Sequence, residues 1–175
     1  MTSADNHIEI VVFTKDRGPL TKRISLVNGE VKSDGSACSM ARGRARRVKL
    51  NGVEQLGPLI EKLKSNQAIA LGAMRPDAGD EVEIATKGEL AANPRDGALA
   101  RTGENFAYAE GKPALVLFDH DTKGMPDSVS AKIESLGGFW GALVSVLPAL
   151  RDAARVVRRS TSSGLSRIDT GEKFE

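Results

Sequence analysis

The chain has 175 residues, of which 40% are hydrophobic, and its formal net charge is +2. A chain of this length can bury one good core, so we expect a single α+β domain over residues 8–175 after a disordered lead at 1–7, with two small domains as the alternative. The small net charge does not by itself indicate a nucleic-acid or membrane partner. Cys38 is the only cysteine, which excludes an intramolecular disulfide.

Neither a secretion signal nor a membrane span is expected. The first residues, MTSADNH, lack the basic and apolar regions of a leader. The most apolar run, 139–150, is shorter than the roughly 20 apolar residues that a span needs. We therefore expect a cytoplasmic protein without a membrane partner.

The first predicted elements are a strand and a hairpin. The run IEIVVFT at 8–14 is rich in β-branched residues, which favour strands. Residues 21–26 and 30–32 flank Asn28-Gly29, a pair that supplies the positive φ angles of a tight type I′ turn. We expect these two segments to form a β-hairpin.

The densest basic stretch in the sequence spans residues 41–49 and contains no acidic residue. Arginine can contact phosphate through a bidentate fork, so this stretch is a candidate phosphate-binding segment. A solvated, flexible surface loop is the alternative interpretation. Its cations are Arg42, Arg44, Arg46, Arg47 and Lys49.

The middle of the chain predicts one helix and two strands. Apolar residues recur at helical spacing between 53 and 64, although Pro58 makes the start of that helix uncertain. Residues 68–74 and 82–86 are typical of strands separated by a turn. Residues 90–111 have the composition of a loop.

The last third begins with a short apolar run at 115–118, which predicts a strand buried on both faces. After a turn at 122–126, Asp127 or Ser128 can cap a helix that runs to about residue 136. A second helix is expected over 139–153, with a break at Pro148. Residues 154–163 suit either the end of that helix or a strand, and we favour the strand.

Two aspartates, Asp119 and Asp121, directly follow the apolar run. In a strand, residues i and i+2 point to the same face, so the two carboxylates would aim together while His120 points away and packs behind the strand. Adjacent carboxylates repel unless a cation neutralises them, and Mg²⁺ or Mn²⁺ prefers such oxygen ligands. The alternative is an exposed turn, because Asp and Gly are ordinary turn residues.

The same stretch resembles the haloacid-dehalogenase phosphatases, in which the first Asp of an Asp-x-Asp motif is the nucleophile and the second a general acid/base. Lys123 stands where that motif has Thr or Val. Only 54 residues follow Asp121, which leaves little room for the family's downstream Lys and acids. A phosphohydrolase of this type is therefore an alternative.

The order LVLFDHDTKGMP, helical stretch and ARVVRRSTSSGLSR also resembles the archaeo-eukaryotic primase superfamily, the primase-polymerases of bacterial mobile elements. The resemblance covers 114–167 and implies an α+β catalytic domain that transfers nucleotides by a two-metal mechanism. DNA template and nucleoside triphosphates would be its partners. It assigns Asp119 and Asp121 as ligands of catalytic Mg²⁺ or Mn²⁺. It also assigns a loop near the triphosphate, formed by Ser162, Ser163 and Gly164 with Arg159, and basic contacts to nucleic acid from Arg155 and Arg158.

Two elements of the family pattern are absent from the sequence, namely the motif histidine and the third acidic motif, which has no candidate position. The family carries a nucleotide-binding His in or just after that loop, but the only histidines are His7 and His120. We therefore expect the chain to be the N-terminal part of a primase-like catalytic domain and to be inactive alone. A non-catalytic nucleic-acid-binding replication accessory module is the third hypothesis.

Overall fold

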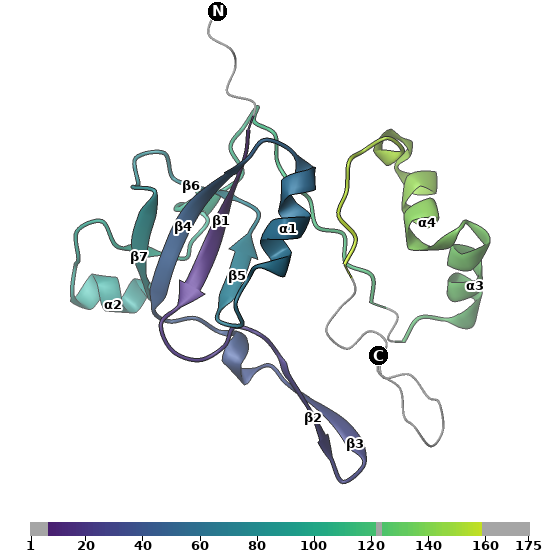
Figure 1. The fold of residues 1–175 in the computed structure, drawn as a ribbon, viewed down its shortest axis with the longest axis horizontal. Helices are drawn as coiled ribbons and strands as arrows, with labels where there is room; N and C mark the ends of the chain where they lie inside the picture. Colours follow the sequence, from purple (N-terminus) through teal and green to yellow (C-terminus); the bar gives the residue numbers. More distant parts are fainter. Residues whose placement is uncertain (1–6, 122–123, 159–175) are drawn as a thin grey trace, which may run out of the picture. The chain divides into compact units, whose positions relative to one another are not determined.

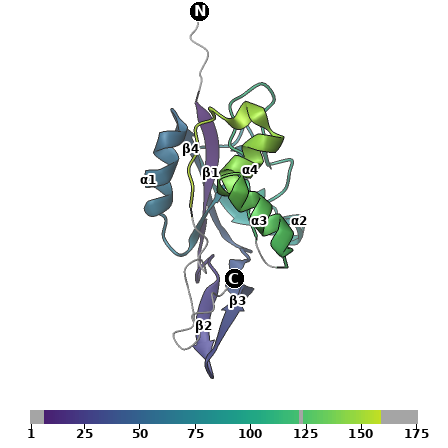
Figure 2. The same cartoon turned by 90° about the vertical axis from the view of Figure 1, so that its right-hand side faces the viewer.

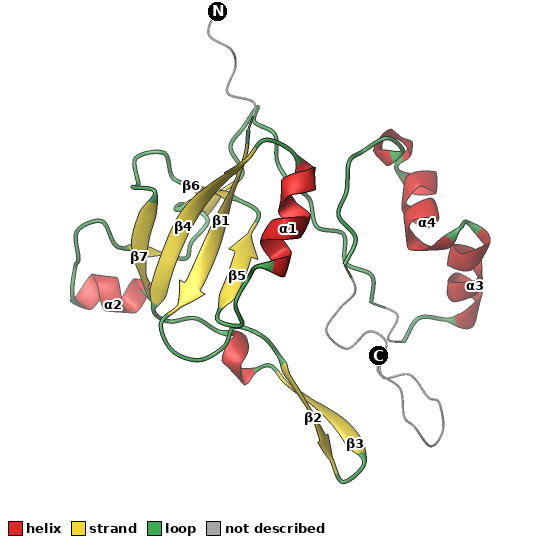
Figure 3. Cartoon of the chain, in the orientation of Figure 1, coloured by secondary structure: helices red, strands yellow, loops and turns green. Residues whose placement is uncertain are grey.

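The computed structural model describes residues 7–121 and 124–158. They form an α+β structure with a mixed sheet and four α-helices in these ranges, which confirms the expected class (Figures 1 and 3). The chain divides into two compact units, Met1–Val116 and Leu117–Glu175. The single domain expected over 8–175 stays a prediction, and the two units are described in turn.

The first unit is built on a five-stranded sheet with the order β5-β1-β4-β7-β8. Neighbouring strands pair antiparallel except β7 and β8, which are parallel. In sheet order the strands are β5 Gln67–Ala70, β1 Ile8–Lys15, β4 Gly43–Leu50, β7 Glu81–Ala85 and β8 Leu99–Ala100. The strand predicted at 8–14 is thus confirmed as a central strand.

The basic stretch 41–49 is a strand and not a flexible loop. β4 pairs with β1 along its whole length and with β7 at its start, so the stretch lies in the middle of the sheet. Burial alternates along its first half, because Gly43 and Ala45 face the core while Arg44 and Arg46 face solvent. The cations concealed this pattern in the sequence, where the inward residues are only a glycine and an alanine.

Two apolar clusters lie on opposite faces of the sheet. The first gathers around Val11 and Phe13, and it includes Met74 and Ile84 among its buried members. The second forms around Ile10 and Leu50, against which α1, Leu56–Glu61, packs. Figure 2 shows α1 beside the sheet when the sheet is seen nearly edge-on. α1 is shorter than the helix predicted at 53–64, and residues 53–55 form a 3₁₀ turn before it.

The predicted hairpin is confirmed as a separate two-stranded sheet that projects from the five-stranded one (Figure 1). β2, Arg23–Val27, pairs antiparallel with β3, Glu30–Asp34. The turn between them has positive φ at Asn28 (53°) and Gly29 (79°). No residue of either strand is buried, so the turn and the ladder bonds hold the hairpin.

The strand predicted at 68–74 is split into two. β5 ends at Ala70, and β6, Ala73–Met74, leaves the sheet to pair with β9, Phe106–Ala107. Gly72 lies at the crossing, where an added Cβ would sit 3.2 Å from the carbonyl carbon of Ala107. The close approach of these two backbones explains the departure from β5.

The segment 90–111, predicted to be mostly loop, is mostly loop, with short regular elements at its start and within it. α2, Lys87–Ala92, precedes β8, and β9 follows it. Thr86 caps α2 by accepting a hydrogen bond from Glu89 N at 3.1 Å. Thr-x-x-Glu is a helix-start signal, so this helix could have been predicted.

The second unit contains α3, Asp127–Ser135, and α4, Gly138–Val146, followed by a 3₁₀ turn, Pro148–Leu150. Both predicted helices and the break at Pro148 are confirmed. Gly137, between the helices, and Gly138, the first residue of α4, have φ angles of 85° and 86°, which glycine adopts without strain. Pro126 occupies the N-cap of α3, so the predicted cap at Asp127 or Ser128 is wrong.

Two predicted strands are not formed. Residues 115–118 have no regular structure, and Val116 and Leu117 are 70% and 76% exposed. Residues 154–158 also lack a strand, and Val157 is 81% exposed. Neither segment pairs with a strand in the described ranges, and an apolar run becomes a strand only where a partner strand accepts its hydrogen bonds. Residues 159–163 of the second prediction lie outside the described residues.

No helix within 7–121 and 124–158 combines the length and apolar character needed to cross a membrane.

Candidate functional site

The two predicted metal ligands, Asp119 and Asp121, are exposed at the start of the second unit. They lie in irregular backbone and not at the end of a strand, so the strand geometry predicted for their side chains is wrong. Both side chains are nevertheless exposed, so a metal ion in solution can reach them, and a single residue separates them in the sequence. Their proposed role as ligands stays a prediction.

His120, between the two acids, stacks on α4. Its ring lies 4.5 Å from the Phe139 ring, with an interplanar angle of 11°. The sequence predicted that this histidine packs or hydrogen-bonds behind a strand, but it packs on a helix, because no strand forms at 115–118. Asp119 and Asp121 therefore flank a residue that contacts α4.

Arg155 also contacts α4, through the next residue along the helix. Its guanidinium carbon lies 4.2 Å from the centroid of the Trp140 ring, a cation–π distance. Phe139 and Trp140 are consecutive, with Cα atoms about 3.8 Å apart in any trans peptide. The first turn of α4 therefore contacts both the histidine between the two aspartates and a predicted nucleic-acid-binding arginine.

The remaining predicted residues are not joined to this arrangement. Arg158 is exposed and makes no hydrogen bond or ion pair in the described part of the chain. Arg159, Ser162, Ser163 and Gly164, predicted near a triphosphate, lie outside the described residues.

The donor set at 119–121 fits a divalent ion shared with a phosphate. In the described residues, no group of three or more His, Cys, Asp or Glu side chains is arranged to hold a metal ion. Mg²⁺ commonly uses one or two carboxylates and completes its shell with water and substrate phosphates. Asp119 and Asp121 provide a hard, exposed oxygen pair of that kind.

The cations of β4 have different roles on the two faces of the sheet. Arg44 is 71% exposed and lies 3.2 Å from Glu81 on the neighbouring strand β7. Arg46, on the same face, makes no hydrogen bond or ion pair with any described residue. Together with Thr14 and Gln67 they line a shallow polar hollow of about 410 Å³.

Arg47 points to the opposite face and is an internal structural residue. Its side chain is only 10% exposed and pairs with Glu9 of β1, which is 16% exposed. It also donates to the carbonyls of Met74, Arg75 and Ala78 at 3.0–3.2 Å. Arg47 therefore fixes the 74–78 segment onto the sheet, and its donors are occupied within the protein.

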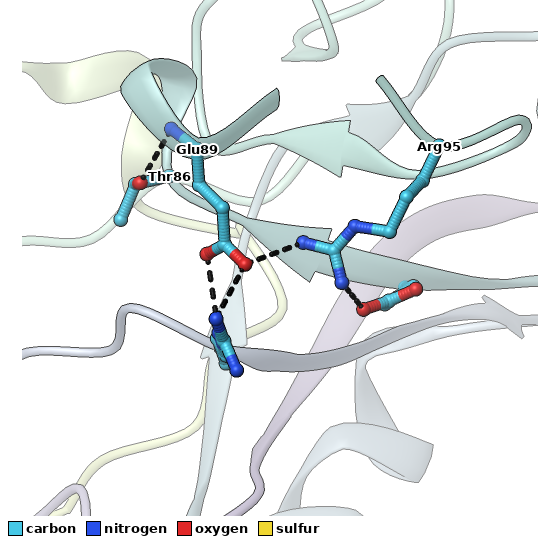
Figure 4. Close-up of polar contacts among 5 residues, drawn as sticks. Thr86, Glu89 and Arg95 are labelled. Atoms are coloured by element: carbon cyan, nitrogen blue, oxygen red, sulfur yellow. Dashed lines mark hydrogen bonds and ion pairs between the residues drawn. The ribbon is translucent and has the colours of Figure 1, made fainter. Parts of the chain in front are cut away.

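A cluster of ion pairs links α2 to the edge of the sheet (Figure 4). Glu89 accepts from Arg42 Nε at 3.1 Å and from Arg95 Nη2 at 2.9 Å, and Arg95 also pairs with Glu83 of β7. The hydrogen bond and charge of Glu89 raise the pKa of Arg42 above its ordinary value. With its charges matched, the cluster is better explained as a structural brace than as an anion site.

A cleft of about 460 Å³ opens in the first unit beside the Glu9–Arg47 pair. Sequence reasoning missed it, because its walls come from the starts and ends of separate elements. Its apolar walls include Leu71, Met74 and Pro76, and its polar groups include Lys49, Glu104 and Lys112. Tyr108, 59% exposed, also lines it.

Comparison of the chain with protein-family models, with curated proteins and with solved structures found no match.

Proposed function

We propose that this chain carries the metal-binding carboxylates of a primase-polymerase-like nucleotidyltransferase that acts in DNA replication of a mobile element. The supporting observation is the pair of contacts on α4. His120 stacks on Phe139, and Arg155 lies over the adjacent Trp140. The residue between the two aspartates and Arg155 thus contact adjacent residues in the first turn of α4. Carboxylates and a guanidinium are groups that can bind a metal–triphosphate complex.

The chemistry assigned to these residues is binding and orientation. Asp119 and Asp121 would hold Mg²⁺ or Mn²⁺ together with the triphosphate oxygens, and the bound ions would stabilise the attacking and leaving oxygens. Arg155 keeps one face of its guanidinium on Trp140, while the N–H edge of this planar group can donate to phosphate. Arg158 would extend the positive charge toward the DNA template.

Binding of Mn²⁺ in the presence of a nucleoside triphosphate tests this function. Free Mn²⁺ is measured by its electron paramagnetic resonance signal during titration of the full chain. We expect Asp119→Asn and Asp121→Asn each to weaken Mn²⁺ binding by at least about tenfold. Asp152→Asn removes an exposed carboxylate elsewhere in the second unit and is the matched control, which should bind Mn²⁺ like the unmodified chain.

Two other results would support the alternative functions instead. Turnover of a phosphomonoester that is lost in Asp119→Asn would indicate a haloacid-dehalogenase-like phosphohydrolase. Salt-dependent DNA binding that Asp119→Ala leaves unchanged, without Mn²⁺ binding, would indicate a replication accessory module. Either result overturns the nucleotidyltransferase proposal.

A further inference from the structure

The floor of the cleft beside Glu9 and Arg47 is held in place by hydrogen bonds within the protein. Arg47 holds three backbone carbonyls of the 74–78 segment, and Glu9 also accepts from Met74 N at 3.2 Å. The opposite wall is tied to this floor, because β6 pairs with β9 and Arg75 N donates to Asn105 O at 2.9 Å. The cleft is thus formed by hydrogen-bonded backbone and is shaped before any ligand arrives.

The size of the cleft is that of a small-molecule site. Its volume of about 460 Å³ lies within the roughly 300–1,000 Å³ typical of ligand pockets. Most of the wall is apolar, including Leu71, Met74 and Pro76. A ligand for this cleft therefore needs an apolar or flat portion as well as polar groups.

The charges of the cleft favour an anion. The charges of Arg47 and Glu9 cancel, so the net charge of the cleft depends on the other residues that line it. Two lysines, Lys49 and Lys112, line the cleft together with one further carboxylate, Glu104. Lys112 makes no side-chain hydrogen bond or ion pair with the described residues, so binding an anion would not break an existing contact.

The remaining side chains suit a ring and its hydroxyl groups. Tyr108 is 59% exposed at the cleft, and its ring makes no aromatic stacking contact within the described ranges. An exposed aromatic ring is a stacking platform for a base. Glu104 is an exposed acceptor that can bind ribose hydroxyls, as acidic residues do in dinucleotide sites.

We propose that this cleft binds a nucleoside phosphate without a metal ion. The base would stack on Tyr108, the ribose would face Glu104, and the phosphate would pair with Lys112 and Lys49. This site belongs to the first unit and does not use Asp119 or Asp121. The proposal therefore goes beyond the nucleotidyltransferase function and does not depend on it.

Calorimetric titration of the full chain with ATP in the presence of EDTA tests the proposal. EDTA removes divalent ions, so binding through Asp119 and Asp121 cannot contribute. We expect ATP to bind, and we expect Lys112→Ala and Tyr108→Ala each to weaken binding by about three- to tenfold. Lys62→Ala removes an exposed lysine from the end of α1, on the other face of the sheet, and should leave the affinity unchanged.

Simpler probes separate the parts of the site. Adenosine and inorganic phosphate should each bind more weakly than ATP, because adenosine lacks the phosphates and inorganic phosphate lacks the base and the ribose. The double variant Asp119→Asn/Asp121→Asn should bind ATP in EDTA like the unmodified chain, even if its Mn²⁺ binding is lost. Tyr108 and Lys112 are exposed, and an unchanged thermal midpoint in each variant would show that the fold is intact.

Three results would overturn the proposal. The first is no detectable ATP binding in EDTA at millimolar concentration. The second is ATP affinity that Lys112→Ala and Tyr108→Ala both leave unchanged in folded protein. The third is adenosine or inorganic phosphate binding as tightly as ATP, since the site would then recognise only one of the two portions.

Discussion

Glu9 of β1 and Arg47 of β4 form a nearly buried ion pair across the central strands of the sheet. In the strand register Glu9 lies opposite Lys49 and Val11 lies opposite Arg47, so Glu9 and Arg47 are diagonal neighbours on one face. Such neighbours are within reach of long side chains. Arg47 fills its remaining donors with backbone carbonyls, which is the condition for a buried charge to be tolerated.

Loss of one partner of this pair should destabilise the protein strongly. Removing Arg47 leaves the nearly buried Glu9 carboxylate without its opposite charge and three carbonyls without the guanidinium donor, so we expect Arg47→Ala to lower the free energy of unfolding by about 3 kcal/mol. Arg44→Ala is the matched control on the same strand, because its exposed pair with Glu81 should contribute less than about 1 kcal/mol. Urea denaturation of both variants measures the difference. Equal losses would show that the buried pair has no special role.

The close packing of β1 against β4 predicts a second contrast, between two glycines. A Cβ added to Gly43 would lie 2.1 Å from Thr14 O and 2.7 Å from Met40 Cε. The strands would have to separate, so Gly43→Ala should cost about 2 kcal/mol or more. Gly57, in α1, has no atom within 4 Å of the same position, and Gly57→Ala should stabilise by about 0.5 kcal/mol. Thermal denaturation measures both effects. If the midpoints of the two variants were both above, or both below, that of the unmodified chain, this prediction would be wrong.

Local signals made part of this fold predictable. The β-branched run at 8–14 and the Asn28-Gly29 turn each contain the information for their element within a few residues. The apolar run at 115–118 does not, because a strand also needs a partner, and the sequence does not say where one lies. β4 was not predicted as a strand, because the inward residues of its first half are only Gly43 and Ala45, and the nearly buried Arg47 looks like a surface charge in the sequence.

The candidate sites divide in the same way. Asp119 and Asp121 form a local motif, so the sequence could propose them. The contacts that gather residues around them, His120 with Phe139 and Arg155 with Trp140, join segments far apart in the chain. The nucleoside-phosphate cleft has no motif, because its walls come from several separate segments that the fold brings together.

The exposed hairpin should respond locally to a change in its turn. Gly29 has a φ of 79°, in the left-handed region, where an L side chain costs roughly 1–2 kcal/mol. Gly29→Ala should therefore speed amide hydrogen exchange in β2 and β3 and leave exchange in β1 and β4 unchanged. Gly35→Ala, just after β3 at a φ of −95°, is the control and should alter neither. Faster exchange in β1 would mean that the hairpin stabilises the central sheet.

Asp77 provides a test based on pH. The Arg75 side chain, through its hydrogen bonds, lowers the pKa of Asp77 from 3.8 to about 2. Because the folded pKa lies below the unfolded one, the ionised carboxylate stabilises the fold above about pH 3.8, and that contribution is lost as the pH falls toward 2. The carboxyl carbon of Asp77, followed by NMR, should titrate near pH 2 in the unmodified chain. In Arg75→Ala it should titrate near its ordinary value, and an unchanged midpoint would refute the assignment.

Trp140 reports directly on the contact with Arg155, because it is the only tryptophan in the chain. The guanidinium covers the ring at 4.2 Å, so Arg155→Ala should expose the indole to water and shift its fluorescence emission to longer wavelength. Arg151→Ala removes an exposed arginine that forms no cation–π contact with Trp140 and should leave the emission unchanged. If the nucleotidyltransferase proposal holds, Mn²⁺ with a nucleoside triphosphate should change the emission of the unmodified chain and not that of Asp119→Asn. Equal emission from all these proteins would mean that Arg155 does not cover Trp140 in solution. The nucleotidyltransferase proposal would then lose a contact on which it depends.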